Sequence, residues 1–172
     1  TFPLEGVKVL DFMWALAGPG ATRTLADMGA TVIRVESSSR LDVIRTIRPF
    51  IDSDESPEKS ALFHNTNAGK NLLSLDLTKP EGKAVALDLV RWCDVVTESF
   101  SPKAMKAFGL DYESLLEVNS DLIMLSTCLF GQTGPLSMFA GYGNLAAAIA
   151  GFYTITGWPD REPAGPFGAY TD

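Results

Sequence analysis

The first 36 residues hold two short apolar runs with a helix-like segment between them, and this order constrains the fold most. Residues 7–12 (VKVLDF) and 31–36 (TVIRVE) are short and mostly apolar, which is typical of buried strands. Residues 18–20 (GPG) open a helical run to about residue 28, and Gly29 ends it. Strand, helix and strand at this spacing predict a βαβ unit with a right-handed crossover.

The rest of the chain continues this alternation and predicts an α/β fold with a doubly wound, mostly parallel sheet. Further strands are expected at residues 71–75, 94–97 and 122–127, and the last is apolar enough for a central parallel strand. Further helices are expected at residues 80–92, 101–108, 111–117 and 144–152. A capping box at residues 78–81 (TKPE) would begin the first of these helices. The polar segment 37–69 predicts a long excursion with a short helix near 61–64.

This architecture also predicts where a ligand binds. In doubly wound sheets, ligands lie beyond the carboxyl ends of the strands. Those ends fall near residues 12–14, 36–38, 75–78, 98–100 and 128–130. We therefore expect the functional site among these segments.

Charge and hydropathy exclude several classes of function. The net charge of −7 makes nucleic acid an unfavourable partner, although a local cluster of Arg or Lys can still hold a phosphorylated cofactor. No run approaches 18 apolar residues, and the first residues lack the pattern of a signal peptide. We expect a cytoplasmic protein without membrane contact. The missing initiator Met and the apolar end at residues 167–170 suggest a fragment of a longer chain.

Cysteine and histidine are too few for most metal or triad chemistry. His64 is the single histidine, and Cys93 and Cys128 do not form a CxxC pair. No metal site is expected, and both cysteines are interpreted as small buried apolar residues in a reducing compartment.

The glycine-rich segment 18–23 (GPGATR) imitates a dinucleotide fingerprint, because Glu36 ends the following strand. Two details argue against NAD. Arg23 occupies the third glycine position, where its bulk would oppose close helix–strand packing, and residues 13–17 separate the strand from Gly18. A NAD-binding Rossmann domain therefore remains a weaker alternative.

Several motifs, taken together and in order, resemble the family III CoA-transferases (the CaiB/BaiF family). They are residues 3–12 (PLEGVKVLDF), 17–19 (AGP), 25–36 (LADMGATVIRVE), 71–77 with 80–83 (PEGK), 94–102 (DVVTESFSP), 109–112 (GLDY), Ser126 and 130–135 (FGQTGP). The resemblance covers nearly the whole chain.

The resemblance implies that residues 1–172 are the N-terminal part of a Rossmann-like, CoA-binding large domain. Known members are longer and form homodimers whose two chains are interlocked. A smaller domain, the C-terminal return to the large domain and a glycine-rich active-site loop would then lie outside this chain. Coenzyme A would be bound as acyl-CoA, and a carboxylic acid would be the second substrate.

The family's nucleophile is an aspartate that follows a Tyr or His by 30 positions, and here Asp172 follows Tyr142 at that spacing. Residues 163–172 (PAGPFGAYTD) also resemble the family's approach to this residue. A carboxylate can attack the acyl-CoA carbonyl to give a mixed anhydride and then an aspartyl-CoA thioester, which divides one difficult exchange into easier steps. The resemblance thus implies that Asp172 is catalytic.

Other positions match the family near the CoA nucleotide or pantetheine. They are Trp14, Ser37, Leu75, Thr78, Ser99, Phe100 and Tyr142, with Arg40, Arg45 and Lys106 as candidates for the phosphates. Some members have a basic residue where Ser37 and Thr78 stand here.

Two other functions remain open. α-Methylacyl-CoA racemases of the same family place a histidine where Tyr142 stands, and tyrosine is a poor base at neutral pH. CoA transfer is therefore the favoured function. A non-catalytic interaction domain is the alternative outside enzymes.

Overall fold

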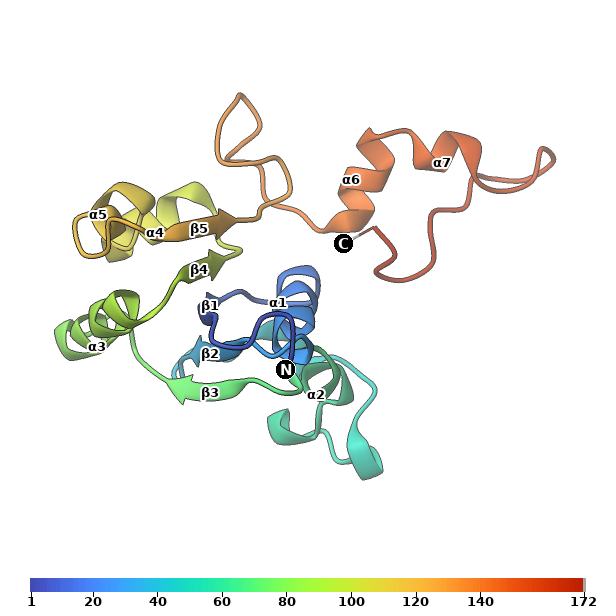
Figure 1. Ribbon diagram of the computed structural model, residues 1–172. Helices are drawn as coiled ribbons and strands as arrows, with labels where there is room; N and C mark the ends of the chain where they lie inside the picture. The colour runs from blue at the N-terminus through green and yellow to red at the C-terminus, as the bar shows by residue number, and fades with distance from the viewer. Residues whose placement is uncertain (172) are drawn as a thin grey trace. The chain divides into compact units, whose positions relative to one another are not determined.

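The computed structural model describes residues 1–171, and these fall into two compact units. The first unit, Thr1–Thr127, contains one five-stranded sheet in the order β3-β2-β1-β4-β5 (Figure 1). Every neighbouring pair of strands is parallel. The strands are β1 (Lys8–Phe12), β2 (Thr31–Glu36), β3 (Asn71–Ser74), β4 (Val95–Glu98) and β5 (Ile123–Ser126). The predicted α/β fold with a parallel sheet is confirmed.

Helices cover both faces of the sheet. Successive side chains of a strand point to opposite faces, so the apolar side chains of β1 pack against helices on each side. Leu10 and Phe12 of β1 pack on the side of α3, α4 and α5, whereas Val9 packs on the side of α1. The helices of this unit are α1 (Ala17–Asp27), α2 (Ala61–Asn67), α3 (Pro80–Trp92), α4 (Pro102–Phe108) and α5 (Tyr112–Leu116). β1 is therefore buried on both faces, as a central parallel strand should be.

The excursion between β2 and β3 is ordered by short helical turns and by one buried hydroxyl. The turns are η1 (Val43–Thr46), η2 (Ile51–Ser53) and η3 (Pro57–Lys59), and α2 follows them. Ser60 Oγ donates to the Ile44 carbonyl over 2.7 Å and accepts from the Phe63 N–H that opens α2. α2 is longer than the predicted helix near 61–64.

The predicted capping box does not form. Lys79 takes the N-cap position of α3 and makes no side-chain cap. Thr78 instead donates its hydroxyl and its backbone N–H to Asp76 Oδ1, at 2.6 and 3.0 Å. The local turn made by Asp76 competes successfully for the group that would have capped the helix.

β5 lies at the edge of the described sheet, so the prediction of a central strand is wrong for this part of the chain. Ile123 and Leu125 on one face of β5 are 63% and 45% exposed, whereas Met124 on the other face packs against the core. An apolar run signals burial by some partner, but it does not reveal which strand pairs with which.

The second unit, from Cys128 onward, contains α6 (Gly143–Ile149) and α7 (Phe152–Ile155). The helix predicted for 144–152 ends early because Gly151 adopts a left-handed conformation with φ 85° and separates the two helices. Cys128 is only half-buried, whereas Cys93 in the first unit is buried as predicted. Burial raises the pKa of the Cys93 thiol to about 11. Within residues 1–171, no helix is long and apolar enough to cross a membrane.

Candidate functional site

The chain leaves β1 toward β2 on one side and returns through β4 on the other, so the direction of winding reverses between β1 and β4. Ligands of doubly wound sheets bind at this point. Trp14 follows β1, and its backbone N–H donates to Ser99 Oγ over 2.8 Å. The Trp14 and Phe100 rings meet edge to face with centroids 5.7 Å apart. Three predicted site residues are therefore brought together at the carboxyl ends of β1 and β4.

Glu98 fixes the backbone beneath Phe100. Its carboxylate Oε2 accepts the Phe100 N–H over 2.8 Å, and its side chain also forms a hydrogen bond with Ser126. Only 1% of Glu98 is exposed. Burial raises the pKa of this carboxyl above its ordinary value, and the two hydrogen bonds oppose that rise. Glu98 is not among the site residues predicted from the sequence.

The segment after β2 brings a cation to the same place. The guanidinium of Arg40 lies over the Trp14 ring, 5.7 Å from its centroid. Ser37 and Arg40 form an isolated antiparallel bridge, and the Ser37 hydroxyl is 2.8 Å from that of Ser39. An open pocket of about 250 Å³ lies beside this turn and is lined by Glu36, Ser37, Ser38, Leu41, Arg45, Glu58, Leu72, Leu73 and Ser74.

Leu75 and Thr78 follow β3 but have different surroundings. The Leu75 N–H donates to the Glu36 carbonyl over 2.9 Å, and its half-buried side chain packs against the core on the α3 face. Thr78 is exposed, and its hydroxyl is bound to Asp76. Both lie on the expected edge of the sheet.

The basic residues are not equivalent. Lys106 is exposed in the last turn of α4. Arg45 is buried, donates to Glu36 Oε1 over 2.6 Å, and stacks on the Phe63 ring with 3.5 Å to the centroid. Because its charge is already matched inside the protein, this placement does not support Arg45 as a phosphate ligand.

The remaining predicted residues belong to the second unit. Tyr142 occupies the N-cap position of α6 and is 66% exposed. Asp172 lies outside the described residues. In residues 1–171, no group of three or more His, Cys, Asp and Glu side chains could hold a metal ion.

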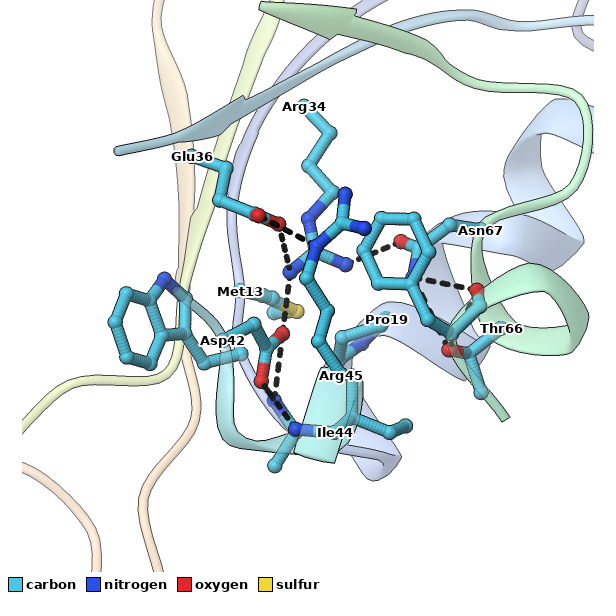
Figure 2. Close-up of polar contacts among 12 residues, drawn as sticks. Met13, Pro19, Arg34, Glu36, Asp42, Ile44, Arg45, Thr66 and Asn67 are labelled. Atoms are coloured by element: carbon cyan, nitrogen blue, oxygen red, sulfur yellow. Dashed lines mark hydrogen bonds and ion pairs between the residues drawn. The ribbon is translucent and has the colours of Figure 1, made fainter. Parts of the chain in front are cut away.

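A buried polar cluster, which was not predicted from the sequence, lies beside the site. Arg34 on β2 pairs with Asp42 and donates to Asn67 Oδ1 (Figure 2). Its guanidinium also faces the Phe63 ring, 5.1 Å from the centroid. Lys70 pairs with Asp11 on β1 at 3.0 Å. Charged residues within the apolar strand runs VKVLDF and TVIRVE were the available signal, since unpaired charges are not buried.

The glycine-rich segment has a packing role in this unit. A Cβ atom on Gly18 would approach Met13 Sδ to 2.5 Å, so glycine allows α1 to begin close to the end of β1. Arg23, at the third position of the imitated fingerprint, donates to the Asn65 carbonyl over 2.6 Å. Its bulk points toward α2.

Comparison with known proteins places the chain in one family. The sequence profile of CoA-transferase family III matches residues 4–172. The chain is 45% identical over 163 residues to succinate–glutarate CoA-transferase of Agrobacterium fabrum, covering 94% of this chain and 41% of that protein. It is 39% identical over 171 residues to human succinyl-CoA:glutarate CoA-transferase, covering 99% and 38%.

Solved structures agree with the described fold. A CAIB/BAIF family protein from Brucella suis superposes with a TM-score of 0.90 at 41% identity, covering 98% of this chain and 44% of that one. Rv3272 from Mycobacterium tuberculosis gives a TM-score of 0.88 at 32% identity, covering 99% and 46%. The chain spans about 40% of the length of the curated relatives that it matches. The match over residues 4–172 shows that this chain belongs to CoA-transferase family III.

Proposed function

We propose that the protein containing this chain is a CoA-transferase that moves coenzyme A from an acyl-CoA donor to a dicarboxylic acid. This proposal rests on the similarity, along nearly the whole chain, to proteins named as CoA-transferases. The acids in the names of these relatives include succinate, glutarate, oxalate and mesaconate, which all bear two carboxylates. Succinyl-CoA as donor and glutarate as acceptor are the first pair to test.

The described unit would serve as the Rossmann-like, CoA-binding part of the large domain. Trp14 and Phe100 offer an aromatic surface, Arg40 offers a cation beside it, and Ser37 and Ser99 offer hydroxyls. Their shared position at the carboxyl ends of three adjoining strands supports this assignment. We assign Leu75, Thr78, Lys106 and Tyr142 as further CoA contacts.

Asp172 would act as the nucleophile on the acyl group. Its carboxylate attacks the donor carbonyl, and the C–S bond breaks to give a mixed anhydride and CoA thiolate. The thiolate then attacks the aspartyl carbonyl, which releases the donor acid and leaves an aspartyl-CoA thioester. The acceptor carboxylate attacks the aspartyl carbonyl of this thioester, and its C–S bond breaks to give a second mixed anhydride and CoA thiolate. The thiolate attacks the acceptor carbonyl of this anhydride, which forms the new acyl-CoA and releases the Asp172 carboxylate.

The sequence of steps consumes no proton overall and requires no metal. Water must be kept from the anhydride, which would otherwise hydrolyse.

We further propose that the full-length protein is a cytoplasmic homodimer with interlocked chains, and light scattering after gel filtration would give its mass.

The Asp172→Ala variant of the full-length protein tests the assignment. Transfer from succinyl-CoA to glutarate, followed by mass spectrometry, should fall by roughly 10³-fold or more, because the nucleophile is lost. The Kd for CoA, measured by calorimetry, should stay within about twofold of the wild-type value, because this residue acts on the acyl end. Hydroxylamine should trap the wild-type intermediate at Asp172.

Four results would contradict the proposal. Wild-type turnover by Asp172→Ala would show that Asp172 is not the nucleophile. Binding of NAD but not CoA would restore the dinucleotide interpretation, and binding of neither would favour an interaction domain. Deuterium uptake at the α-carbon of a chiral 2-methylacyl-CoA in heavy water, without transfer to any added acid, would move the function to racemisation.

A further inference from the structure

The turn that carries Trp14 is held from two sides by side chains of two other loops. The Trp14 N–H donates to Ser99 Oγ, in the loop after β4. The next N–H, that of Ala15, donates to both oxygens of Asp42, at 3.1 and 3.2 Å. Asp42 lies in the excursion after β2. Two consecutive backbone donors thus connect the ends of β1, β4 and β2.

Asp42 is itself built into the interior. Its side chain is fully buried, its Oδ1 accepts the Ile44 N–H at 3.1 Å, and its Oδ2 is paired with the buried guanidinium of Arg34. Figure 2 shows Asp42 between Arg34 and Ile44. Charge-assisted hydrogen bonds in a buried setting are strong and hold their acceptor in one orientation. The Ala15 N–H therefore has a fixed partner.

Ala15 requires such a partner because its backbone is left-handed, with φ 63°. An L-residue other than glycine, asparagine or aspartate seldom adopts this conformation without compensation. The conformation of Ala15 sets the direction of the chain immediately after Trp14. The indole of Trp14 meets Phe100 and Arg40 from that position.

We propose that Asp42 is a positioning residue of the CoA site, which acts through the left-handed Ala15 to hold the Trp14 indole against Phe100 and Arg40. This inference rests on the proposed function, because the effect of positioning Trp14 is measured as a change in CoA binding. Asp42 does not touch the reacting atoms. Its loss should weaken acyl-CoA binding and leave the chemical step largely intact.

The experiment compares Asp42→Asn, Ala15→Gly and the double variant in the full-length protein. Asp42→Asn should raise KM for succinyl-CoA about tenfold with kcat within about threefold, the size expected for one lost charge-assisted hydrogen bond. Ala15→Gly removes the strain of the left-handed conformation, since glycine adopts it freely, and provides the background against which Asp42→Asn is compared. In the Ala15→Gly background, Asp42→Asn should raise KM by a clearly smaller factor than in the wild type, measured where denaturant titration shows every variant to be folded, so that a global loss of stability does not account for the difference.

A second readout follows Trp14 directly. In protein labelled with 5-fluorotryptophan, the ¹⁹F resonance of Trp14 is identified by its loss in Trp14→Phe. Asp42→Asn should shift or broaden this resonance without CoA present. Glu55→Gln is the matched control, because it removes an exposed carboxylate of the same excursion, which pairs with Arg48, and it should change neither readout.

The outcomes separate the two proposals. An unchanged Trp14 resonance together with an unchanged KM in Asp42→Asn would overturn the positioning role. The same holds if Asp42→Asn raises KM by the same factor in the Ala15→Gly background as in the wild type. If the wild-type protein transfers no CoA, the proposed function fails, while the Trp14 resonance still decides whether Asp42 positions the indole. Should Asp42→Asn not fold, Asp42→Glu keeps the negative charge for Arg34 but moves the carboxylate relative to the Ala15 N–H, and it is held to the same expectations.

Discussion

Glu98 shows how a single buried carboxyl can serve the site at a cost to stability. It accepts the Phe100 N–H and lies next to Ser126, but burial favours its protonated form and raises its pKa. A carboxyl whose folded-state pKa is raised contributes stability that is fully present below the unfolded value. That contribution is lost as the pH rises through the folded value. Glu98 should therefore oppose folding at neutral pH.

The Glu98→Gln variant of the full-length protein tests this account. An amide keeps an acceptor for the Phe100 N–H and has no charge to desolvate. Its free energy of unfolding should match that of the wild type near pH 4 and exceed it by about 1 kcal/mol at pH 7, for each unit by which the folded pKa is raised. Denaturant titrations across this pH range would measure the difference.

Glu98→Ala serves as the control, because it removes both the charge and the acceptor. It should be less stable than Glu98→Gln at every pH, since the Phe100 N–H is left unpaired. Parallel pH profiles for Glu98→Gln and the wild type would show that the pKa of Glu98 is the same in the folded and unfolded states and would contradict the argument.

At the scale of the element, a second buried ion pair joins pieces that are distant in sequence. Lys70, between α2 and β3, donates to Asp11 on β1, to the Pro19 carbonyl over 2.8 Å and to Thr22 Oγ1 on α1 over 2.7 Å. Burial lowers the pKa of Lys70, and the attraction of Asp11 opposes that shift. The cluster thus fixes α1 and the end of the long excursion onto the central strand.

Replacing Lys70 by Met should be costly, because the Asp11 carboxylate would stay buried without its cation. We expect a loss of about 3 kcal/mol in the free energy of opening of β1, as measured by native-state hydrogen exchange. The double variant Asp11→Asn/Lys70→Met should regain part of that loss. Lys59→Met, which removes an exposed pair with Asp52 at 3.7 Å, should change this free energy by less than about 1 kcal/mol. Equal effects of Lys59→Met and Lys70→Met would refute the interpretation.

The elements also show what a sequence can predict. The bounds of β2 agree at both ends, because an apolar run between Gly29 and a polar segment leaves few alternatives. The strand ends placed Trp14, Ser99 and Phe100 on one edge, so that part of the site was predictable. The positions of Asp42 and Lys70 were not, since pairing between charges 8 and 59 positions apart depends on tertiary contacts. The capping box failed for a local reason, the competing turn at Asp76.

At the scale of the whole molecule, the described residues expose several large apolar side chains. β5 ends the described sheet with Ile123 and Leu125 exposed, the latter by 45%. In the second unit, Ile155, Trp158 and Phe167 are also exposed. Large apolar patches and unpaired strand edges promote association unless another segment or chain covers them. The chain spans about 40% of the length of the curated relatives that it matches.

The final prediction compares residues 1–172 expressed alone with the full-length protein. The short chain should bind the dye ANS and associate as its concentration rises, because the edge of β5 and the apolar surface stay open. In the full-length protein, amide hydrogens of Ile123–Ser126 should exchange at least about tenfold more slowly, since a covered edge must open before exchange. The amides of β1, which is central in both proteins, provide the internal reference. Slow exchange of β5 in the short chain, without ANS binding or association, would contradict this prediction. It would show that residues 1–172 protect this edge without any further segment or chain.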